Sequence, residues 1–123
     1  MVQTKEFLPA LVIALEWAHH VQDAVGIYRV GPMESPAEWL DVYSIELELM
    51  ADCMSGAWAQ DLNTRGALEQ GDVDATAQFT MTTLGDPGFI DEYDPQAHGN
   101  GPQRTQAFLL GYSDGFLGCN IVI

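Results

Sequence analysis

The chain has 123 residues, which is enough for one hydrophobic core and too few for two of ordinary size. Hydrophobic residues make up 47% of the chain, so we expect a packed, ordered domain spanning residues 1–123. The formal net charge is -14, with 18 Asp and Glu against four Lys and Arg. Such a charge repels nucleic-acid phosphates and anionic lipid, so neither is expected as a partner.

Membrane targeting is also not expected from the sequence. The apolar stretch over residues 7–13 is interrupted by Pro9 and followed by Glu16 and two histidines. It therefore fits neither a signal peptide nor a membrane span. The residues alone indicate no compartment.

The first predicted helix covers about residues 8–25. Its apolar residues recur at helical spacing, Pro9 is placed in its first turn, and Gly26 is the predicted end. A second helix is predicted from Ser35-Pro36-Ala37-Glu38, which has the pattern of a capping box with proline at the first helical position. Apolar residues at three- and four-residue intervals continue this amphipathic helix to about Leu62.

Two further helices complete the predicted fold. Gly71 and Asp72 offer a start for a helix over about 73–84, which contains several threonines and ends before Pro87. After a long irregular loop over 86–101, a last helix is expected over about 102–116. Strand signals are nearly absent, so the predicted fold class is all-α with four principal helices.

Unusual polar residues gather in two of these helices, in Leu15-Glu16-Trp17-Ala18-His19-His20 and in Glu48-Leu49-Met50-Ala51-Asp52-Cys53. Here the chain resembles the neutral zinc metallopeptidases, a gluzincin-like family with a His-Glu-x-x-His-His helix followed by a Glu-Leu-x-Ala-Asp-Cys segment. The resemblance extends from about Leu11 to Cys119 through further short segments: Gly71-Asp72-Val73, His98-Gly99, Gln103-Arg104 and Gly111-Tyr112.

The resemblance implies a role for each matching residue. In such a helix two histidines at i and i+4 bind zinc, and the glutamate between them activates the bound water. His19 matches the second zinc histidine, Glu16 the general base, and Glu48 the ligand from the following helix. Asp52 would contact and orient a zinc-binding histidine without itself binding the metal. His98 would lie near the active site and donate to a developing oxyanion.

The chain departs from the family pattern at the first zinc histidine, where Leu15 stands. Leucine cannot bind a metal, so only His19 and Glu48 remain of three protein ligands, and we expect zinc to be absent or weakly bound. His20 cannot replace the lost ligand because adjacent helical residues point about 100° apart. We expect His20 at the surface or in contact with the residues that bind the metal. Alternatively, Glu16 and His20, which are four residues apart, could together bind an ion.

Two structural expectations follow from the resemblance. Few residues precede Glu16, which leaves no room for the β-sheet of a zincin fold. We therefore expect the helical part of a zincin-like catalytic domain without its sheet. The family's membrane anchor is also not found in this chain, and the resemblance hints at an exported or membrane-anchored origin.

The two cysteines, Cys53 and Cys119, are too few for a disulfide scaffold and are not spaced as a metal knuckle. By themselves they are equally compatible with two buried thiols and with one long-range bridge. Because both match family positions, the resemblance favours a disulfide, provided that the compartment is oxidising.

Without a metal, the polar residues of the motif need other partners if they are buried. We expect His19 to bond to Glu48 or Asp52. Arg104, in the first turn of the last helix, is disfavoured by the helix dipole and should pair with an acid, with Asp52 or Glu46 as candidates.

Three functions are compatible with these residues. The leading hypothesis is a degenerate metallopeptidase-like domain that lacks efficient proteolysis and binds a protein partner or a second copy of itself. The first alternative is a residual zinc hydrolase, acting on peptides or amides only when metal is bound to His19, Glu48 and a third group such as Glu16, His98 or a residue of a partner subunit. The second alternative is an acidic inhibitor that mimics nucleic acid.

Overall fold

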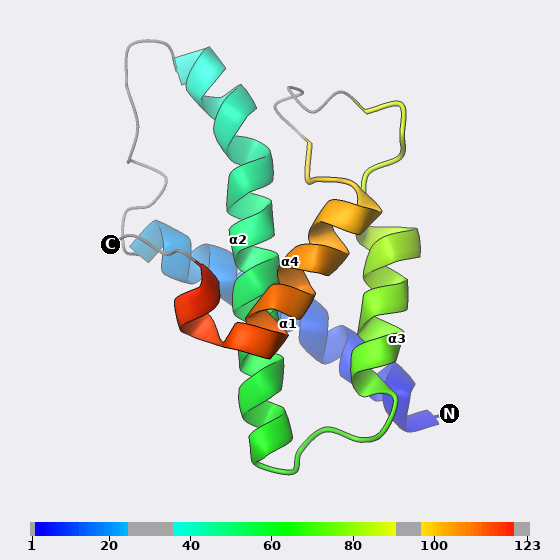
Figure 1. Ribbon diagram of the computed structural model, residues 1–123. Coiled ribbons are helices and arrows are strands. Elements are labelled where there is room, and N and C mark those ends of the chain that lie inside the picture. Colours follow the sequence, from blue (N-terminus) through cyan, green and yellow to red (C-terminus); the bar gives the residue numbers. More distant parts are fainter. Residues whose placement is uncertain (1, 25–35, 91–96, 120–123) are drawn as a thin grey trace.

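The computed structural model describes residues 2–24, 36–90 and 97–119 (Figure 1). Within these ranges the chain is helical and contains no strand, which confirms the all-α fold class with four principal helices. None of the described helices is both long and apolar enough to cross a membrane. The elements are α1 (Val2–Ala24), α2 (Pro36–Thr64), α3 (Asp72–Phe79), the π-helix η2 (Thr80–Leu84), α4 (Gly101–Asp114) and the 3-10 helix η3 (Phe116–Cys119).

Helix α1 starts earlier than its sequence pattern predicts, at Val2 instead of near Leu8. Pro9 therefore lies inside the helix, and its predicted place in the first turn is wrong. Proline in a helix interior removes one backbone hydrogen bond, but Phe7 is buried and stacks on Trp58 with ring centroids 5.9 Å apart. Burial of Phe7 stabilises the turn before the proline. The predicted helix end at Gly26 and the predicted cap at Ser35 lie outside the described residues.

The third predicted helix is formed by two elements, α3 and η2, which together cover residues 72–84. The change to π-helical bonding begins at Thr80, and the Gly85 N–H donates to the Thr80 carbonyl oxygen. Threonine is a weak helix former, and the Thr82 hydroxyl donates to the backbone oxygen of Gln78, 2.8 Å away. This competition with the backbone is the physical reason for the irregular last turn.

Helix α4 packs closely against the middle of α2. The contact depends on two glycines, since a Cβ atom at Gly111 would overlap the Cys53 carbonyl oxygen and one at Gly56 would overlap the Phe108 carbonyl oxygen. Beyond α4, η3 is held to α2 by a disulfide between Cys53 and Cys119, as the family resemblance implies. This close approach places the N-terminal turn of α4 beside the acidic residues of α2.

The hydrophobic core lies where α1 crosses α2, and α4 covers it from the other side of α2 (Figure 1). Leu15 belongs to this core, with 8% of its surface exposed. The residue that stands at the position of the family's first zinc histidine is therefore a packing residue. The buried members of the core are Phe7, Leu11, Leu15, Ala18, Ala51, Met54, Ala59 and Phe108.

Candidate functional site

The centre of the candidate site is a contact between His19 on α1 and Glu48 on α2. The His19 Nε2 atom lies 3.2 Å from the Glu48 Oε2 atom, and both side chains are largely buried. These are the two residues that match the family's remaining zinc ligands. In this structure they bind each other, as the sequence predicts for a site without metal.

The other nitrogen of the His19 ring is held by Gln22, one turn further along α1. The Gln22 Nε2 atom donates to the Leu47 carbonyl oxygen at 2.9 Å, so its Oε1 atom is left as an acceptor for His19 Nδ1, also 2.9 Å away. Gln22 is completely buried. This residue therefore fixes the ring so that Nε2 points at Glu48, a function that the sequence analysis assigned to Asp52.

The contact shifts the pKa values of both partners in opposite directions. The hydrogen bond to Glu48 raises the pKa of His19 above its ordinary value, although burial opposes the shift. Burial works to raise the pKa of Glu48, but the hydrogen bond and charge of His19, with the charges of Arg104 and His98, hold it below its ordinary value. The contact thus favours the protonated form of His19 and the ionised form of Glu48.

The pair should make the stability of the metal-free protein depend on pH. A raised histidine pKa stabilises the fold fully below the unfolded value of 6.5, and this contribution is lost as pH rises through the folded pKa. A lowered glutamate pKa stabilises the fold above the unfolded value of 4.5 and is lost at lower pH. We therefore expect the contribution of the pair to be largest between these values and to fall as pH rises above 6.5.

Urea unfolding at several pH values, with chelator present, measures this effect. His19→Gln should flatten the decrease above pH 6.5, whereas His20→Gln serves as the matched control because the exposed His20 ring contacts Trp17 in a tilted arrangement instead. An equal pH dependence in wild type and His19→Gln would show that the ion pair does not contribute.

A second ion pair lies one turn further along α2. The Arg104 Nε and Nη2 atoms each donate to one oxygen of the Asp52 carboxylate at 2.8 Å. The Arg104 Nη1 atom donates to the Leu84 carbonyl oxygen at 3.0 Å. Asp52 is 3% exposed, and this burial raises its pKa to about 6 against the opposing influence of Arg104. This confirms the predicted pairing of Arg104 with Asp52. Because the Arg104 Nη2 atom also lies 3.6 Å from the Glu48 Oε2 atom, the two ion pairs form one network.

The loop before α4 brings His98 to the edge of this network. The Asp86 Oδ2 atom accepts the backbone N–H groups of His98 at 2.6 Å and Gly99 at 3.0 Å. The His98 ring is half exposed, with Nε2 3.9 Å from Glu48 Oε1 and Nδ1 3.6 Å from Asp86 Oδ1. Asp86 therefore positions His98, which the family resemblance implies near the active site.

Two predicted site residues lie away from these contacts. Glu16 and His20 are exposed on α1, and the His20 ring centroid lies 5.0 Å from that of Trp17. The negative charge of Glu16 helps to raise the pKa of His19. The general base implied by the resemblance therefore acts on the network through its charge.

The described side chains do not form the ligand set of a catalytic zinc site. In residues 7–24, 45–90 and 97–119, no group of three or more His, Cys, Asp or Glu side chains is arranged to hold a metal ion. Leu15 is packed in the core, and His19 and Glu48 are bonded to each other. A zinc enzyme needs three protein ligands and an open position for water, so the donor set does not fit the group that the resemblance implies.

Gln22 and Asp86 are site residues that the sequence motif did not predict. Gln22 follows Leu15 and Ala18 at helical spacing, and a polar residue on such an apolar stripe is itself a signal that the side chain has a partner. Asp86 stands in an Asp-Pro turn, where a carboxylate commonly accepts nearby backbone N–H groups. Its contact with His98 crosses a loop, so it could not be predicted from local spacing.

Comparisons with known proteins agree with this motif. The model of the family described as "Putative neutral zinc metallopeptidase" matches residues 2–121. "Uncharacterized protein YpfJ" of Escherichia coli K12 is 31% identical over 119 residues, which cover 89% of this chain and 41% of that protein. "Uncharacterized protein Rv2575" of Mycobacterium tuberculosis H37Rv is 29% identical over 124 residues, which cover 89% of this chain and 42% of that protein.

The chain thus spans about two fifths of the length of the curated relatives it matches. No solved structure gives a significant match. The family model, in contrast, covers nearly the whole chain and includes both helices that carry the polar network. The protein therefore belongs to the neutral zinc metallopeptidase family.

Proposed function

We propose that this domain is a member of the zinc metallopeptidase family that lacks efficient proteolysis and acts by binding a protein. The observation that carries the proposal is the state of the three ligand positions. One of them is Leu15, which is packed in the core, and the other two, His19 and Glu48, bind each other in a partly buried ion pair.

The hydrogen-bond and ion-pair network around these residues has a structural role. Gln22 and Arg104 bind the two ends of the His19–Glu48 pair, and both are buried. A zinc ion at this position would have to replace the contact between His19 Nε2 and Glu48 and would still lack a third ligand. The polar residues of the motif therefore stabilise the packing of α1, α2 and α4 in place of holding a catalytic metal.

Zinc affinity and peptide hydrolysis test the proposal. We expect wild type to bind zinc more than about 100-fold more weakly than Leu15→His. Even the loss of a residue that only contacts a metal ligand lowers metal affinity by about 10–100-fold. Affinity is measured by competition with a chromogenic chelator, and hydrolysis with a fluorogenic peptide library. Leu15→Gln is the matched control, since it brings a polar side chain to the same core position without supplying a zinc ligand.

The proposal would be overturned if wild type purified without added metal held one zinc per chain and hydrolysed peptides. Loss of both properties in His19→Ala, and loss of hydrolysis alone in Glu16→Gln, would then identify a working metallopeptidase. If Leu15→His fails to fold, zinc titration of wild type and His19→Ala still distinguishes the two outcomes.

One observation favours a residual zinc hydrolase as a second candidate. The His98 Nε2 atom lies 3.9 Å from Glu48 Oε1, on the side of the carboxylate that His19 does not occupy. The half-exposed His98 ring thus offers a second imidazole beside the carboxylate of Glu48. This candidate requires that His98→Ala abolish zinc binding in wild type.

A further inference from the structure

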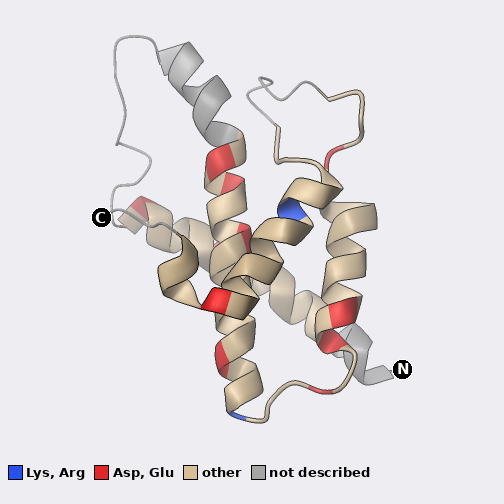
Figure 2. Ribbon diagram, in the orientation of Figure 1, with Lys and Arg blue, Asp and Glu red and all other residues tan. Residues whose placement is uncertain are grey.

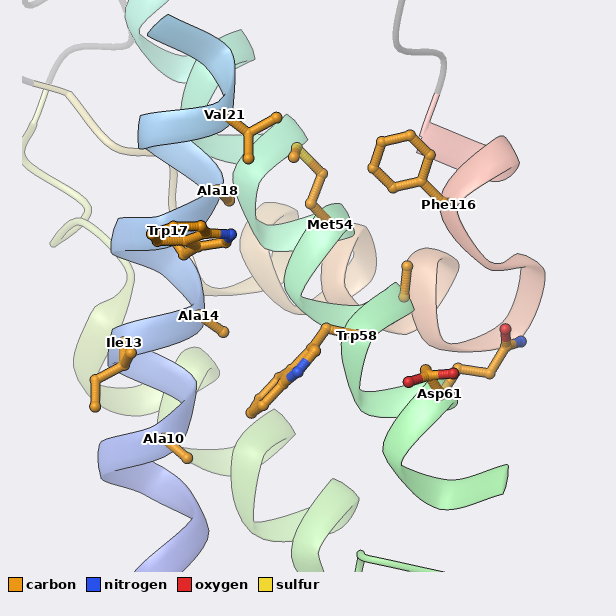
Figure 3. Close-up of a pocket in the computed structure, with 12 residues that line it drawn as sticks. Ala10, Ile13, Ala14, Trp17, Ala18, Val21, Met54, Trp58, Asp61 and Phe116 are labelled. Atoms are coloured by element: carbon orange, nitrogen blue, oxygen red, sulfur yellow. The ribbon is translucent and has the colours of Figure 1, made fainter. Parts of the chain in front are cut away.

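A large apolar groove lies along α1 and α2, and Phe116 of η3 lines it from the side of α2 opposite to α1 (Figure 3). Its volume is about 690 Å³. The walls are formed by Ile13 and Trp17 of α1, Met54 and Trp58 of α2, and Phe116 of η3. Its size and lining are typical of a binding site for an apolar surface.

The groove has the dimensions of a helical segment. Along α1 it is bounded by residues from Ala10 to Val21, which at about 1.5 Å per residue span about 16 Å. Ala10, Ala14 and Ala18 follow each other at intervals of four and face the groove between the larger side chains (Figure 3). Small residues between ridges let another helix approach closely, as in packing of ridges into grooves.

The walls of the groove are exposed to an unusual degree for large apolar side chains. Ile13 is 70% exposed, Trp17 66% and Phe116 49%. All three line the same groove, and exposed apolar side chains gathered at one site mark sites of interaction. The groove is separate from the polar network, since the His19 ring of α1 contacts Glu48 and Gln22 and does not line it.

Charge indicates which occupant is favoured. Arg65 and Arg104 are the only Lys or Arg whose side chains the structure describes, and both pair with aspartates, whereas acidic positions occur on all four helices (Figure 2). Asp61 lines the groove, and its bond to Arg65 is exposed and therefore weak. Glu16 and Asp23 are exposed on α1. The chain's charge of -14 repels a second copy and attracts a basic partner.

The geometry points to a docking site for a basic amphipathic helix of a partner protein, with its apolar face in the α1/α2 groove and its Lys or Arg residues toward Glu16 and Asp61. This is the helix-in-groove mode, in which apolar anchors at i, i+3, i+4 and i+7 provide affinity and flanking charges provide orientation. The inference deepens the proposed binding function by stating the chemistry of the partner, and it rests on that proposal.

A synthetic 14-residue peptide, with leucine on one helical face and lysine elsewhere, is the probe. We expect fluorescein-labelled peptide to bind the full chain with a shift of the tryptophan emission to shorter wavelength, because Trp17 and Trp58 line the groove. Trp17→Ser and Ile13→Ser should each weaken binding at least about tenfold, as expected for exposed anchors of an interface. Leu117→Ser is the matched control, since Leu117 is 94% exposed and outside the groove.

Two further peptides test specificity. A peptide of the same composition with its leucines scattered over the helix, and one with glutamate in place of lysine, should both bind at least about tenfold more weakly. Equal binding of either peptide, or equal weakening by Leu117→Ser, would overturn the inference. A dimer in sedimentation equilibrium that Ile13→Ser abolishes would also overturn it, because the occupant would then be a second copy.

The failure of this inference can be distinguished from failure of the proposed function. Mass spectrometry of the peptide after incubation shows whether it is cleaved. Cleavage that depends on zinc and His19 would contradict the proposed function, whatever residues bind the peptide. An intact peptide that does not bind would contradict only the docking site.

Discussion

Replacing Arg104 with methionine is expected to lower the free energy of unfolding by about 3–5 kcal/mol at pH 7, because it leaves the buried carboxylate of Asp52 without its partner. Methionine retains much of the side-chain volume, so the loss of stability measures the effect of removing the positive charge. The effect should decrease as pH is lowered, since Asp52 can then be buried in its protonated form. Urea unfolding followed by far-UV circular dichroism measures both.

Arg65→Met is the matched control for this substitution. Arg65 also binds an aspartate at 2.8 Å, but the pair with Asp61 is exposed, so the expected loss is below about 1 kcal/mol. The double variant Asp52→Leu/Arg104→Met should recover much of the stability, because replacing both members of a buried pair avoids an unpaired charge. Similar losses in Arg104→Met and Arg65→Met would show that burial does not govern the energy of the Asp52 pair.

Loss of the Cys53–Cys119 disulfide is expected to destabilise the domain by about 4 kcal/mol, because the bond closes a long loop with a sequence separation of 66 residues. The loop contains α3 and α4, so reduction frees much of the chain in the unfolded state. The measurement compares urea midpoints of the oxidised protein, the reduced protein and Cys53→Ala/Cys119→Ala.

The double cysteine variant also controls for the reducing agent. Its midpoint should be low and unchanged by reductant, whereas that of wild type should fall to a similar value on reduction. An oxidised wild type no more stable than the reduced protein would contradict the expected contribution of the bond. Because the disulfide holds η3 to α2, its loss should also weaken binding at Phe116, which lines the α1/α2 groove.

Local sequence signals predicted the helices well where side-chain chemistry acts within one turn. Pro36 begins α2 as expected, and the threonines after Phe79 weaken the third helix as expected. The start of α1 was wrong because it depends on a distant contact, the stacking of Phe7 on Trp58 of α2. The cap of α4 was missed as well. Asn100 and Gln103 form a capping box there, and the helix begins at Gly101, one residue before the predicted start at Pro102.

The candidate site was predictable only in part. The motif identified His19, Glu48 and Asp52, and the position of Arg104 in the first turn of the last helix, which the helix dipole disfavours for a cation, implied an acidic partner. The spacing of Glu48 and Asp52 places both on one face of α2, but it does not state which of them His19 meets. That choice depends on the crossing of α1 over α2 and on the approach of α4, which brings Arg104 to Asp52 and leaves Glu48 for His19.

The sequence by itself determined the all-α class, the acidic charge, the family and the presence of Leu15 where the family resemblance implies a histidine, because composition, helical periodicity and motif spacing are properties of neighbouring residues. The tertiary structure alone decided that Gln22 orients His19, that Asp86 positions His98, and that α1 and α2 enclose an apolar groove. These features depend on the angles and distances at which helices pack. Such packing is set by side chains far apart in the chain, including the glycines that let α4 approach α2.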